Sequence, residues 1–391
     1  MGEWEMVRLG DVGVFQTGGT PSRNKSDYFE GSHPWVTTPS LGSTYIDDSN
    51  ANAFLTDEAI NSSATKIIPA NSLLIGIRVG VGKSSINSVP ICTNQDIVSI
   101  SKIDTSKVSL EYLHKFLATQ QNYLNSQKRG ATIQGIKTET LKELQISLPP
   151  LDVQKKIADI LDQVTDLIEK RKAQITKLDL LVKSQFIEMF GDPVTNPMGW
   201  ETKSLCKLGE LNRGVSKHRP RNDPKLLGGK YPLIQTGEVA NADLYLTTYS
   251  STYSKTGYQQ SKMWPKGTLC ITIAANIAKT AILDFDSCFP DSIVGFVPGE
   301  HTNQLFMHYW FSFFQELLEK QAPQSAQRNI NLQILRNIEV TVPPIDLQNR
   351  FANFVTETEQ SKVKMQQGLD KLELLYKSLM QKCFGGANFE Q

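Results

Sequence analysis

The sequence lacks the features of membrane-bound and secreted proteins. Its longest uninterrupted apolar stretches are much shorter than the 18 or more residues that a membrane-spanning helix needs. The 5 cysteines are odd in number and include no Cys-x-x-Cys pair, which favours reduced thiols over a disulfide framework or a zinc site. The first residues have neither the basic nor the apolar region of a signal peptide. These absences predict a soluble, cytoplasmic protein with no membrane among its partners.

The chain also lacks an excess of either charge. Forty-one Lys and Arg face 40 Asp and Glu, a formal net charge of +1, so a nucleic-acid site must come from local basic patches. Hydrophobic residues at 39% and charged residues at 21% argue against extensive disorder. At 391 residues the chain exceeds the size at which a single core stops growing, so two or more domains are expected.

The sequence contains an internal duplication with a period of about 195 residues. Trp4-Glu5 returns as Trp200-Glu201, 196 residues later, and Leu148-Pro149-Pro150 returns as Val342-Pro343-Pro344, 194 residues later. Six such matches follow one another in the same order. The small drift in the offset indicates two copies of one unit that differ by short loop insertions.

Each copy contains a globular part followed by a long helix. The globular parts alternate short β-rich runs with Gly, Pro, Asn and Ser, and each closes with a more helical stretch, which is typical of an α+β domain. Each long helix follows a Pro-Pro pair, where a helix can begin. The predicted segments are a first globular domain at 1–150, a first long helix at 151–192, a second globular domain at 193–344 and a second long helix at 345–391.

Apolar spacings of three and four predict that the long helices form a coiled-coil seam with a stutter near its middle. The alternative, a solitary amphipathic helix on a globular core, is disfavoured by the length of the pattern. An antiparallel return of the second helix buries both seams without a long loop. The expected fold is therefore α+β, with two similar globular domains separated by an antiparallel coiled coil and related by a pseudo-two-fold axis. The predicted seam residues are Ile157, Ile160, Val164, Ile175, Leu178 and Val182, and Phe351, Phe354, Met365, Leu369, Leu372 and Tyr376.

Signatures of catalysis are missing. The sequence contains no H-E-x-x-H, no G-x-S-x-G and no G-x-G-x-x-G after a predicted strand. The five histidines show no metal-ligand spacing, and His114 and His308 each lie in an apolar helical run, where a packed structural role is expected. We therefore predict no catalytic residue and no metal ligand, and a protein that binds and positions its partners.

One segment comes close to a phosphate-binding P-loop. Residues 76–84 read Gly-Ile-Arg-Val-Gly-Val-Gly-Lys-Ser, but a P-loop needs glycine where Ile77 stands. The second copy, at residues 272–280, lacks the glycines yet keeps Lys279 and a hydroxyl residue. An ATPase is therefore nearly excluded, and we predict a tight turn between strands that presents Lys83 and Lys279 to a phosphate backbone.

The loops between the predicted strands carry the binding signal. Glycine turns let a backbone approach a phosphate, while Arg and Asn supply hydrogen-bonding forks for guanine and adenine edges. A solvated loop without a ligand is the alternative for any single residue. Similar loops with different basic and amide content suggest one scaffold that reads two sequences. The predicted DNA-binding residues are Gly18, Gly19, Thr20, Ser22, Arg23, Asn24, Lys25, Thr37, Thr38, Arg78, Lys83, Arg129 and Gln134, and Arg213, Ser216, Lys217, His218, Arg219, Arg221, Gln235, Thr236, Asn276, Lys279, Gln327 and Arg328.

The same motifs follow one another in both copies. Each copy opens with Trp-Glu and Leu-Gly-Asp/Glu, and closes with Pro-Pro-aliphatic-Asp-aliphatic-Gln at the head of a long helix. The first copy also contains Gly-Gly-Thr-Pro-Ser at residues 18–22 and Pro-Trp-Val-Thr-Thr at 34–38, which the second copy replaces. Over nearly its whole length the chain resembles the specificity subunit of type I restriction-modification systems.

This resemblance implies a non-catalytic subunit. Each globular domain would read one half of a split, asymmetric target in double-stranded DNA, and the helix pair would set the spacing of the halves. The chain itself would bind no cofactor. It would hold two methyltransferase subunits, which bind S-adenosylmethionine, methylate adenine and would carry out any base flipping. The complex can recruit two restriction subunits driven by ATP and Mg²⁺.

A protein-interaction adaptor is the alternative from another functional class. Its two domains would bind proteins or glycans at the two ends of a coiled-coil spacer. This hypothesis remains an alternative because the near-neutral charge of the chain does not by itself favour a nucleic-acid partner. Strong salt dependence of duplex binding would separate the two hypotheses, because phosphate contacts release counterions.

Overall fold

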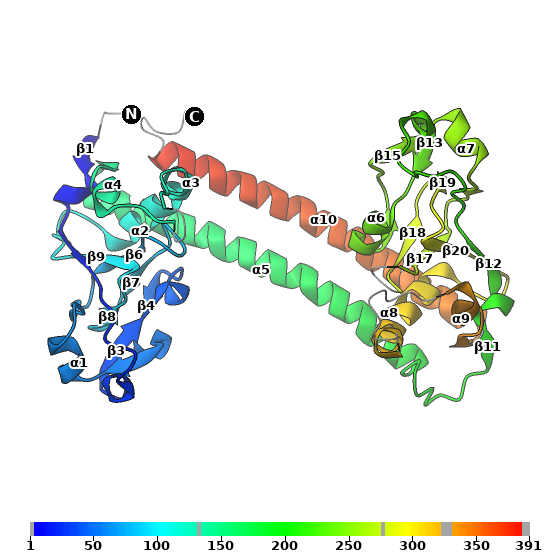
Figure 1. The fold of residues 1–391 in the computed structure, drawn as a ribbon, viewed down its shortest axis with the longest axis horizontal. Coiled ribbons are helices and arrows are strands. Elements are labelled where there is room, and N and C mark those ends of the chain that lie inside the picture. Colours follow the sequence, from blue (N-terminus) through cyan, green and yellow to red (C-terminus); the bar gives the residue numbers. More distant parts are fainter. Residues whose placement is uncertain (1–3, 131–133, 275–277, 322–330, 385–391) are drawn as a thin grey trace. The chain divides into compact units, whose positions relative to one another are not determined.

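The structure of the chain is a computed structural model that describes residues 4–130, 134–274, 278–321 and 331–384, the side chains of 316–321 excepted. The chain forms two compact units (Figure 1). Unit 1 consists of residues 1–172 and 367–391, and unit 2 of residues 173–366. No helix among the described residues is long and apolar enough to cross a membrane.

Unit 1 is built on a five-stranded sheet in the order β2-β9-β6-β7-β4, with a three-stranded sheet, β5-β3-β8, and a two-stranded ribbon, β1-β10. Its strands are β1 Glu5–Arg8, β2 Val14–Thr17, β3 His33–Val36, β4 Tyr45–Ile46, β5 Ala53–Leu55, β6 Leu73–Gly76, β7 Ser84–Asn87, β8 Cys92–Thr93, β9 Ile97–Ser101 and β10 Gln145–Leu148. Its short helices are α1 Asp57–Asn61, α2 Leu110–Thr119, α3 Gln121–Ser126 and α4 Thr138–Lys142.

Unit 2 repeats this plan with a five-stranded sheet in the order β12-β20-β17-β18-β14, a four-stranded sheet, β15-β13-β19-β16, and the ribbon β11-β21. Its strands are β11 Thr202–Ser204, β12 Gly209–Arg213, β13 Leu227–Leu233, β14 Tyr245–Leu246, β15 Ser251–Tyr253, β16 Met263–Trp264, β17 Leu269–Thr272, β18 Thr280–Leu283, β19 Ser287–Cys288, β20 Ile293–Pro298 and β21 Glu339–Thr341. Its shorter helices are α6 Thr236–Asn241, α7 Lys255–Gln259, α8 Gln304–Gln321 and α9 Leu332–Arg336.

The two large sheets have the same topology. In both, the first four strands in sheet order are antiparallel neighbours, and the last strand, β4 or β14, pairs in parallel with its neighbour. This correspondence confirms the duplication, and with the two long helices it confirms the predicted α+β fold.

Two helices of 40 residues complete the units, α5 at Leu151–Phe190 and α10 at Ile345–Phe384. Unit 1 contains the first part of α5 and the last part of α10, and unit 2 contains the remaining parts. The core of unit 1 accordingly includes Leu161 of α5 and Met380 of α10, and the core of unit 2 includes Phe186 of α5 and Phe351 of α10. Within each unit the two helices therefore run in opposite directions.

A buried glutamine explains why the segment at the head of each helix is the same in both copies. The Gln154 Oε1 atom accepts from the Ser109 N–H at 2.9 Å, and its Nε2 atom donates to the carbonyls of Lys107 and Pro149, both at 2.8 Å. Gln348 makes the equivalent three bonds in unit 2, where its partners are Asn303, His301 and Pro343. The side chain thus ties the first turn of the long helix to the loop before α2 or α8, and leaves no polar atom of that side chain unpaired at a fully buried position.

Burial along α5 corrects the predicted seam. Ile160 is 48% exposed, and Leu161, at 1%, takes its place. Less exposed residues then alternate at spacings of four and three: Ile157, Leu161, Val164, Ile168, Arg171, Ile175, Leu178 and Val182. The stutter expected near the middle is absent from this helix, which is described in full, because Arg171 fills the gap between the apolar residues and lies against Gly368. The alternation is a regular heptad.

The same alternation continues along α10. Its less exposed positions are Phe351, Val355, Thr358, Lys362, Met365, Leu369, Leu372 and Tyr376. Of the predicted seam residues here, Phe351 and Leu369 are buried, and Phe354, Met365, Leu372 and Tyr376 are half-buried. In α5, Ile157, Val164 and Val182 are buried, and Ile175 and Leu178 are half-buried.

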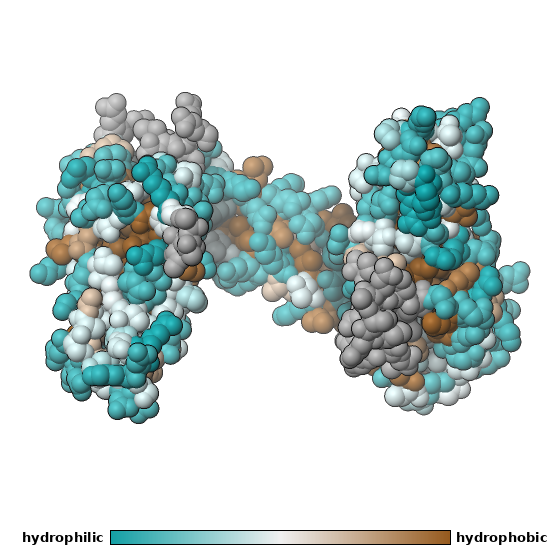
Figure 2. Space-filling model, in the orientation of Figure 1, coloured by the Kyte–Doolittle hydropathy of each residue, from teal (hydrophilic) through white to brown (hydrophobic). Residues whose placement is uncertain are grey.

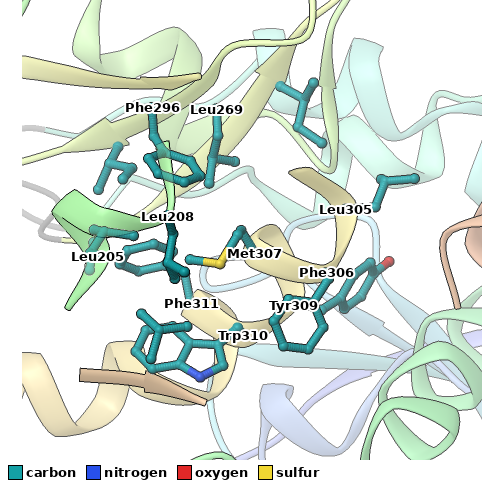
Figure 3. Packing of buried hydrophobic residues seen from close by; sticks show 14 of the residues in the cluster. Leu205, Leu208, Leu269, Phe296, Leu305, Phe306, Met307, Tyr309, Trp310 and Phe311 are labelled. Atoms are coloured by element: carbon teal, nitrogen blue, oxygen red, sulfur yellow. The ribbon is translucent and has the colours of Figure 1, made fainter. Parts of the chain in front are cut away.

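Aromatic side chains dominate the core of unit 2. Phe186 of α5 packs on Phe306 and Phe313 of α8 and on Phe351 of α10, with ring centroids 5.5, 5.1 and 5.4 Å apart. The other face of α8 carries Met307 and Phe311 toward the sheet residues Leu269 and Phe296 (Figure 3). One helix, α8, therefore joins the sheet to both long helices.

Each unit buries a histidine that is paired with a hydroxyl group. The His114 Nδ1 atom lies 2.9 Å from Ser84 Oγ, and the His308 Nδ1 atom lies 3.0 Å from Thr280 Oγ1. Burial lowers the pKa of each imidazole to about 4. Both histidines are therefore neutral at pH 7 and serve as packed structural residues, as predicted.

These histidines predict how stability depends on pH. In the unfolded chain a histidine takes up its proton near pH 6.5, whereas in the folded chain it stays neutral down to about 4. Folded-state stability is thus complete above pH 6.5 and falls as the pH decreases toward 4, by roughly 3 kcal/mol per histidine. In denaturant titrations between pH 4 and 7, His114→Asn should flatten this slope, while the exposed His301→Asn should not. Equal slopes in the two variants would contradict the neutral, buried imidazole.

Candidate nucleic-acid interface

Three loops meet at one edge of the large sheet of unit 1. Strands β2, β9 and β6 are neighbours and antiparallel, so the end of β2 at Thr17, the start of β9 at Ile97 and the end of β6 at Gly76 lie at the same edge. The sheet thereby brings together the Gly-rich loop at 18–25, the turn at 77–83 and the segment at 94–96. We call these loops the reading edge of unit 1, and it contains several residues predicted to bind DNA.

Side chains from different loops contact one another at this edge. Arg78 Nη1 donates to Asp96 Oδ1 at 3.1 Å, and Asn94 Nδ2 donates to the other carboxylate oxygen at 3.1 Å. Thr20 donates to the amide oxygen of Gln95. Sequence reasoning missed Asn94, Gln95 and Asp96. The available signal was their position directly before a central strand, whose neighbours end in the predicted loops.

A fourth segment joins this edge. The N–H of Ile136 donates to the carbonyl of Ile77 at 2.8 Å, which places the segment beside the turn that carries Arg78. Arg129 and Gly135 exchange two backbone hydrogen bonds, at 2.9 and 3.1 Å, and close a small loop. Arg129 and Gln134 are both exposed on it.

The loop at 22–25 is exposed, as a contact surface requires. Ser22, Arg23, Asn24 and Lys25 all face solvent, and the Lys25 ammonium donates to the Tyr28 hydroxyl at 2.7 Å. The half-buried Thr37 has its hydroxyl bonded to the Asn52 side chain at 2.7 Å. The surface of the loop thus offers one guanidinium, one ammonium and one amide.

Four of the predicted DNA contacts are corrected by burial. Gly18 and Gly19 donate their N–H groups to the carbonyls of Ile97 and Thr93, and a Cβ on either would come within 2.5 Å of neighbouring atoms. These glycines are needed for the loop to pack against the strands. Thr38 is 3% exposed and Ser216 is 6% exposed. Side chains so buried have no surface for a base or a backbone.

The P-loop-like segment is a turn between antiparallel strands, as predicted. Gly80 and Gly82 adopt positive φ angles of 63° and 82°, and β7 follows directly. A P-loop would lead into a helix instead. Lys83 lines a groove of unit 1 with His114 and Asp162, and Lys279 lines the equivalent groove of unit 2 with His308 and Glu359. Both lysines are exposed, but carboxylates surround them, and phosphate contact by either stays a prediction.

The equivalent edge of unit 2 gathers arginines around one carboxylate. Strand β12 ends at Arg213 and β20 begins at Ile293, and we call the loops that meet there the reading edge of unit 2. Arg219 Nη2 lies 3.3 Å from Asp291 Oδ2, Arg221 pairs with the other carboxylate oxygen, and Arg213 Nε donates to the Asp291 carbonyl at 2.8 Å. This edge therefore carries an excess of positive charge.

Other predicted residues of unit 2 lie on the same loops. Lys217 and His218 are exposed, and their backbone N–H groups both donate to Gln260 Oε1, at 2.6 and 2.9 Å. Thr236 Oγ1 lies 3.0 Å from Ser292 Oγ, and Gln235 is exposed at the start of α6. The predictions for Asn276, Gln327 and Arg328 fall outside the described residues.

The described residues contain no group of three or more His, Cys, Asp or Glu that could hold a metal ion. The Ser84–His114 and Thr280–His308 pairs have the donor and acceptor types of a nucleophile and its base, but all four residues are buried. Both pairs lie in the walls of the two grooves, where the histidines are 8 and 9% exposed. The residues exposed at the two reading edges are polar and basic, which suits binding.

Comparison with known proteins identifies relatives of the chain. It is 30% identical over 251 residues to the type I restriction enzyme MjaIX specificity subunit of Methanocaldococcus jannaschii, a match that covers 60% of this chain and 57% of the relative. It is 32% identical over 173 residues to the EcoR124I/EcoR124II specificity subunit of Escherichia coli, covering 42% of each. The matched part of the chain thus spans about half the length of these curated relatives.

Solved structures and a family model complete the comparison. A chain from a study of complex assembly and conformational transition of the type I restriction-modification system has a TM-score of 0.66 and 17% identity, with 97% of both chains covered. The S subunit from M. genitalium has a TM-score of 0.59 and 15% identity, with 98% and 97% covered. These likenesses support the fold. The family model described as the type I restriction modification DNA specificity domain matches residues 1–177 and 197–374, and so the chain, which carries this domain twice, belongs to that family.

Proposed function

We propose that this chain is the DNA-recognition subunit of a type I restriction-modification complex. One observation carries the proposal: both units present the same sheet edge, but with different exposed side chains. Unit 1 offers Arg78 with amides and hydroxyls, whereas unit 2 offers Arg213, Arg219 and Arg221 around Asp291. Side chains of this kind contact base edges and phosphates. Each unit would therefore read a different half-site, and the target would be bipartite and asymmetric.

A pair of exposed leucines that recurs in both long helices supports two equal partner sites. Leu180-Leu181 of α5 and Leu374-Leu375 of α10 are equivalent in the repeat, and all four side chains are exposed, by 58, 47, 68 and 46%. Figure 2 shows apolar patches on the surface of the long helices. Large apolar side chains are rarely left in solvent as a repeated pair, so such pairs mark a protein interface. We assign them to two copies of one partner, the methyltransferase subunit.

The division of chemistry follows from this assignment. The chain would recognise DNA and set the half-site spacing through α5 and α10, while the methyltransferase subunits would bind S-adenosylmethionine and methylate adenine. Restriction subunits, where present, would bring the ATP and Mg²⁺ chemistry. The absence of a catalytic role for this chain is part of the proposal, and the match to the DNA specificity domain supports it.

Mapping N6-methyladenine across the source genome tests the proposal. Deleting the gene should remove methylation from a single split motif. Exchanging residues 1–149 for the same segment of another family member should then change one half of the motif and leave the other half and the spacer as they were. The exchange ends before α5, so the coiled coil stays intact.

Two outcomes would overturn the proposal. If both halves of the motif changed, the units would not read DNA independently. If deletion changed no methylation and the purified chain bound duplex DNA without salt dependence, the protein-interaction adaptor would take its place.

A further inference from the structure

The arginine cluster of unit 2 is organised by a single carboxylate. Asp291 accepts from Arg219 at 3.3 Å and from Arg221, and its carbonyl accepts from Arg213. Arg219 Nη1 also donates to the carbonyls of Ser216 and His218, at 2.6 and 2.9 Å. The guanidinium of Arg219 is thereby held by three groups, although its side chain remains 54% exposed.

A carboxylate at this position is unfavourable for binding to phosphate alone. Asp291 is 31% exposed and cancels part of the charge that the three arginines would offer to a DNA backbone. The Asp291 carboxylate is favourable if recognition depends on the orientation of the guanidinium groups more than on their total charge. Arginine has a long, flexible side chain, and an ion pair on one edge of the planar group fixes the direction of the other N–H groups.

Fixed guanidinium groups favour one base. The two parallel N–H donors of arginine match the O6 and N7 atoms of guanine in the major groove, whereas adenine presents one acceptor and one donor there. Lysine, with its freely rotating point charge, cannot supply the same planar fork. The cluster therefore suits guanine in the half-site that unit 2 reads.

Unit 1 contains a related arrangement with one arginine. Asp96 lies directly before β9, and Asp291 lies two residues before the equivalent strand β20. The arginine partner of Asp96, Arg78, comes from the turn after β6, whereas Arg219 and Arg221 come from the loop after β12. The same sheet edge thus holds a carboxylate in both units, but the arginines that it orients differ in number and origin.

We propose that Asp291 is a positioning residue that orients Arg219 and Arg221 for guanine in the half-site of unit 2. This inference rests on the proposed function and makes it more specific. Arg219 and Arg221 contact the base edges, and Asp291 acts through them. The half-site of unit 2 therefore contains guanine, at positions that depend on Arg219 and Arg221.

The test uses the full chain, co-expressed with its methyltransferase subunits in a host that lacks N6-methyladenine. The readout is the methylated motif in a plasmid library with randomised target positions. Arg219→Gln or Arg221→Gln should lower discrimination for guanine about 5- to 150-fold at one position in the half read by unit 2. Asp291→Asn should relax the same positions, Asp291→Glu should restore part of the preference, and the other half-site should not change.

A matched control separates positioning from overall charge. Asp223→Asn removes a negative charge from the same loop, where Asp223 pairs with His218, and asparagine keeps the hydrogen bond to the Lys225 N–H. If Asp291 acted only through its charge, both substitutions would tighten binding to every sequence equally, and base preference would stay constant. Thermal unfolding identifies any variant that fails to fold. If Asp291→Asn fails to fold, the milder Asp291→Glu replaces it, and a guanine preference equal to that of the wild type in this variant would contradict the role of Asp291.

The outcomes also distinguish this inference from the proposed function. If the wild-type complex methylates no split motif, the proposed function fails. If it methylates a split motif whose half for unit 2 lacks guanine, or whose guanine preference survives Asp291→Asn, the proposed function stands and the role of Asp291 is wrong.

Discussion

Replacing Phe186 by alanine is expected to lower the free energy of unfolding of unit 2 by about 3–5 kcal/mol. The Phe186 side chain is fully buried, and it lies between α8 and α10 in contact with Phe306, Phe313 and Phe351. Removing it deletes a ring from the point where three helices meet and leaves a cavity that rigid neighbours cannot fill. The measurement is hydrogen exchange at the backbone amides of β17 and β20, compared with those of β6 and β9 in unit 1.

The control lies on the next residue of the same helix. Ile187 is 37% exposed, and Ile187→Ala should cost only about 1–2 kcal/mol because part of the side chain already faces solvent. Amides of unit 1 should exchange at the wild-type rate in both variants. Equal destabilisation by the two substitutions would show that α5 does not pack in the core of unit 2 through Phe186.

A longer helix pair is expected to change the target of the complex. Seven residues inserted after Gln174 in α5 and seven after Gln366 in α10 keep the four-three alternation of the seam, because the insertion is one heptad. Each insertion adds about 10.5 Å of helix between the two units. At about 3.4 Å per base pair, the unspecified spacer should lengthen by about three base pairs, and methylation of the original motif should be lost.

A loop insertion of the same length is the control for this experiment. Seven Gly and Ser residues placed between Met198 and Gly199 lengthen the chain without lengthening either helix, at a position where a Cβ on Gly199 would meet no atom within 4 Å. The spacer should stay at its wild-type length in that variant. A spacer that is unchanged after the heptad insertions would remove the role of α5 and α10 in setting the distance.

The sequence was sufficient to predict the duplicated α+β architecture and both long helices. Forty residues of helical periodicity after a Pro-Pro pair leave little ambiguity, because a pattern of that length averages over local exceptions. The assignment of single residues to the seam is less well determined by the pattern. Ile160 and Leu161 both satisfy a spacing of three or four from Ile157, and only the continuous alternation through Arg171 selects Leu161. Because Arg171 is charged, a pattern built from apolar residues alone omits it and does not distinguish Leu161 from Ile160.

The candidate interface was predicted only in part, for two physical reasons. Glycines in a loop indicate that another group lies close to the loop backbone. The sequence does not show whether that group belongs to the same protein or to a ligand. For Gly18 and Gly19 the close neighbours are residues of the same unit. Asp96 and Asp291 were missed because their partners lie on other loops, and pairing across a sheet edge leaves no spacing in the sequence. Exposed basic loops were predictable because they recur at the same place in both copies.

The unequal way in which the chain is divided has a consequence for folding during synthesis. Unit 2 consists of one continuous stretch, residues 173–366, so all of its core can form once α10 has emerged past Gln366. Unit 1 is interrupted, and its core needs Met380 and Phe384 from the end of α10. Although the first globular part leaves the ribosome first, its core stays incomplete until the last turn of α10 has been synthesised. The core of unit 2 can therefore be complete before that of unit 1, in contrast to the usual N-terminal-first order of domain folding.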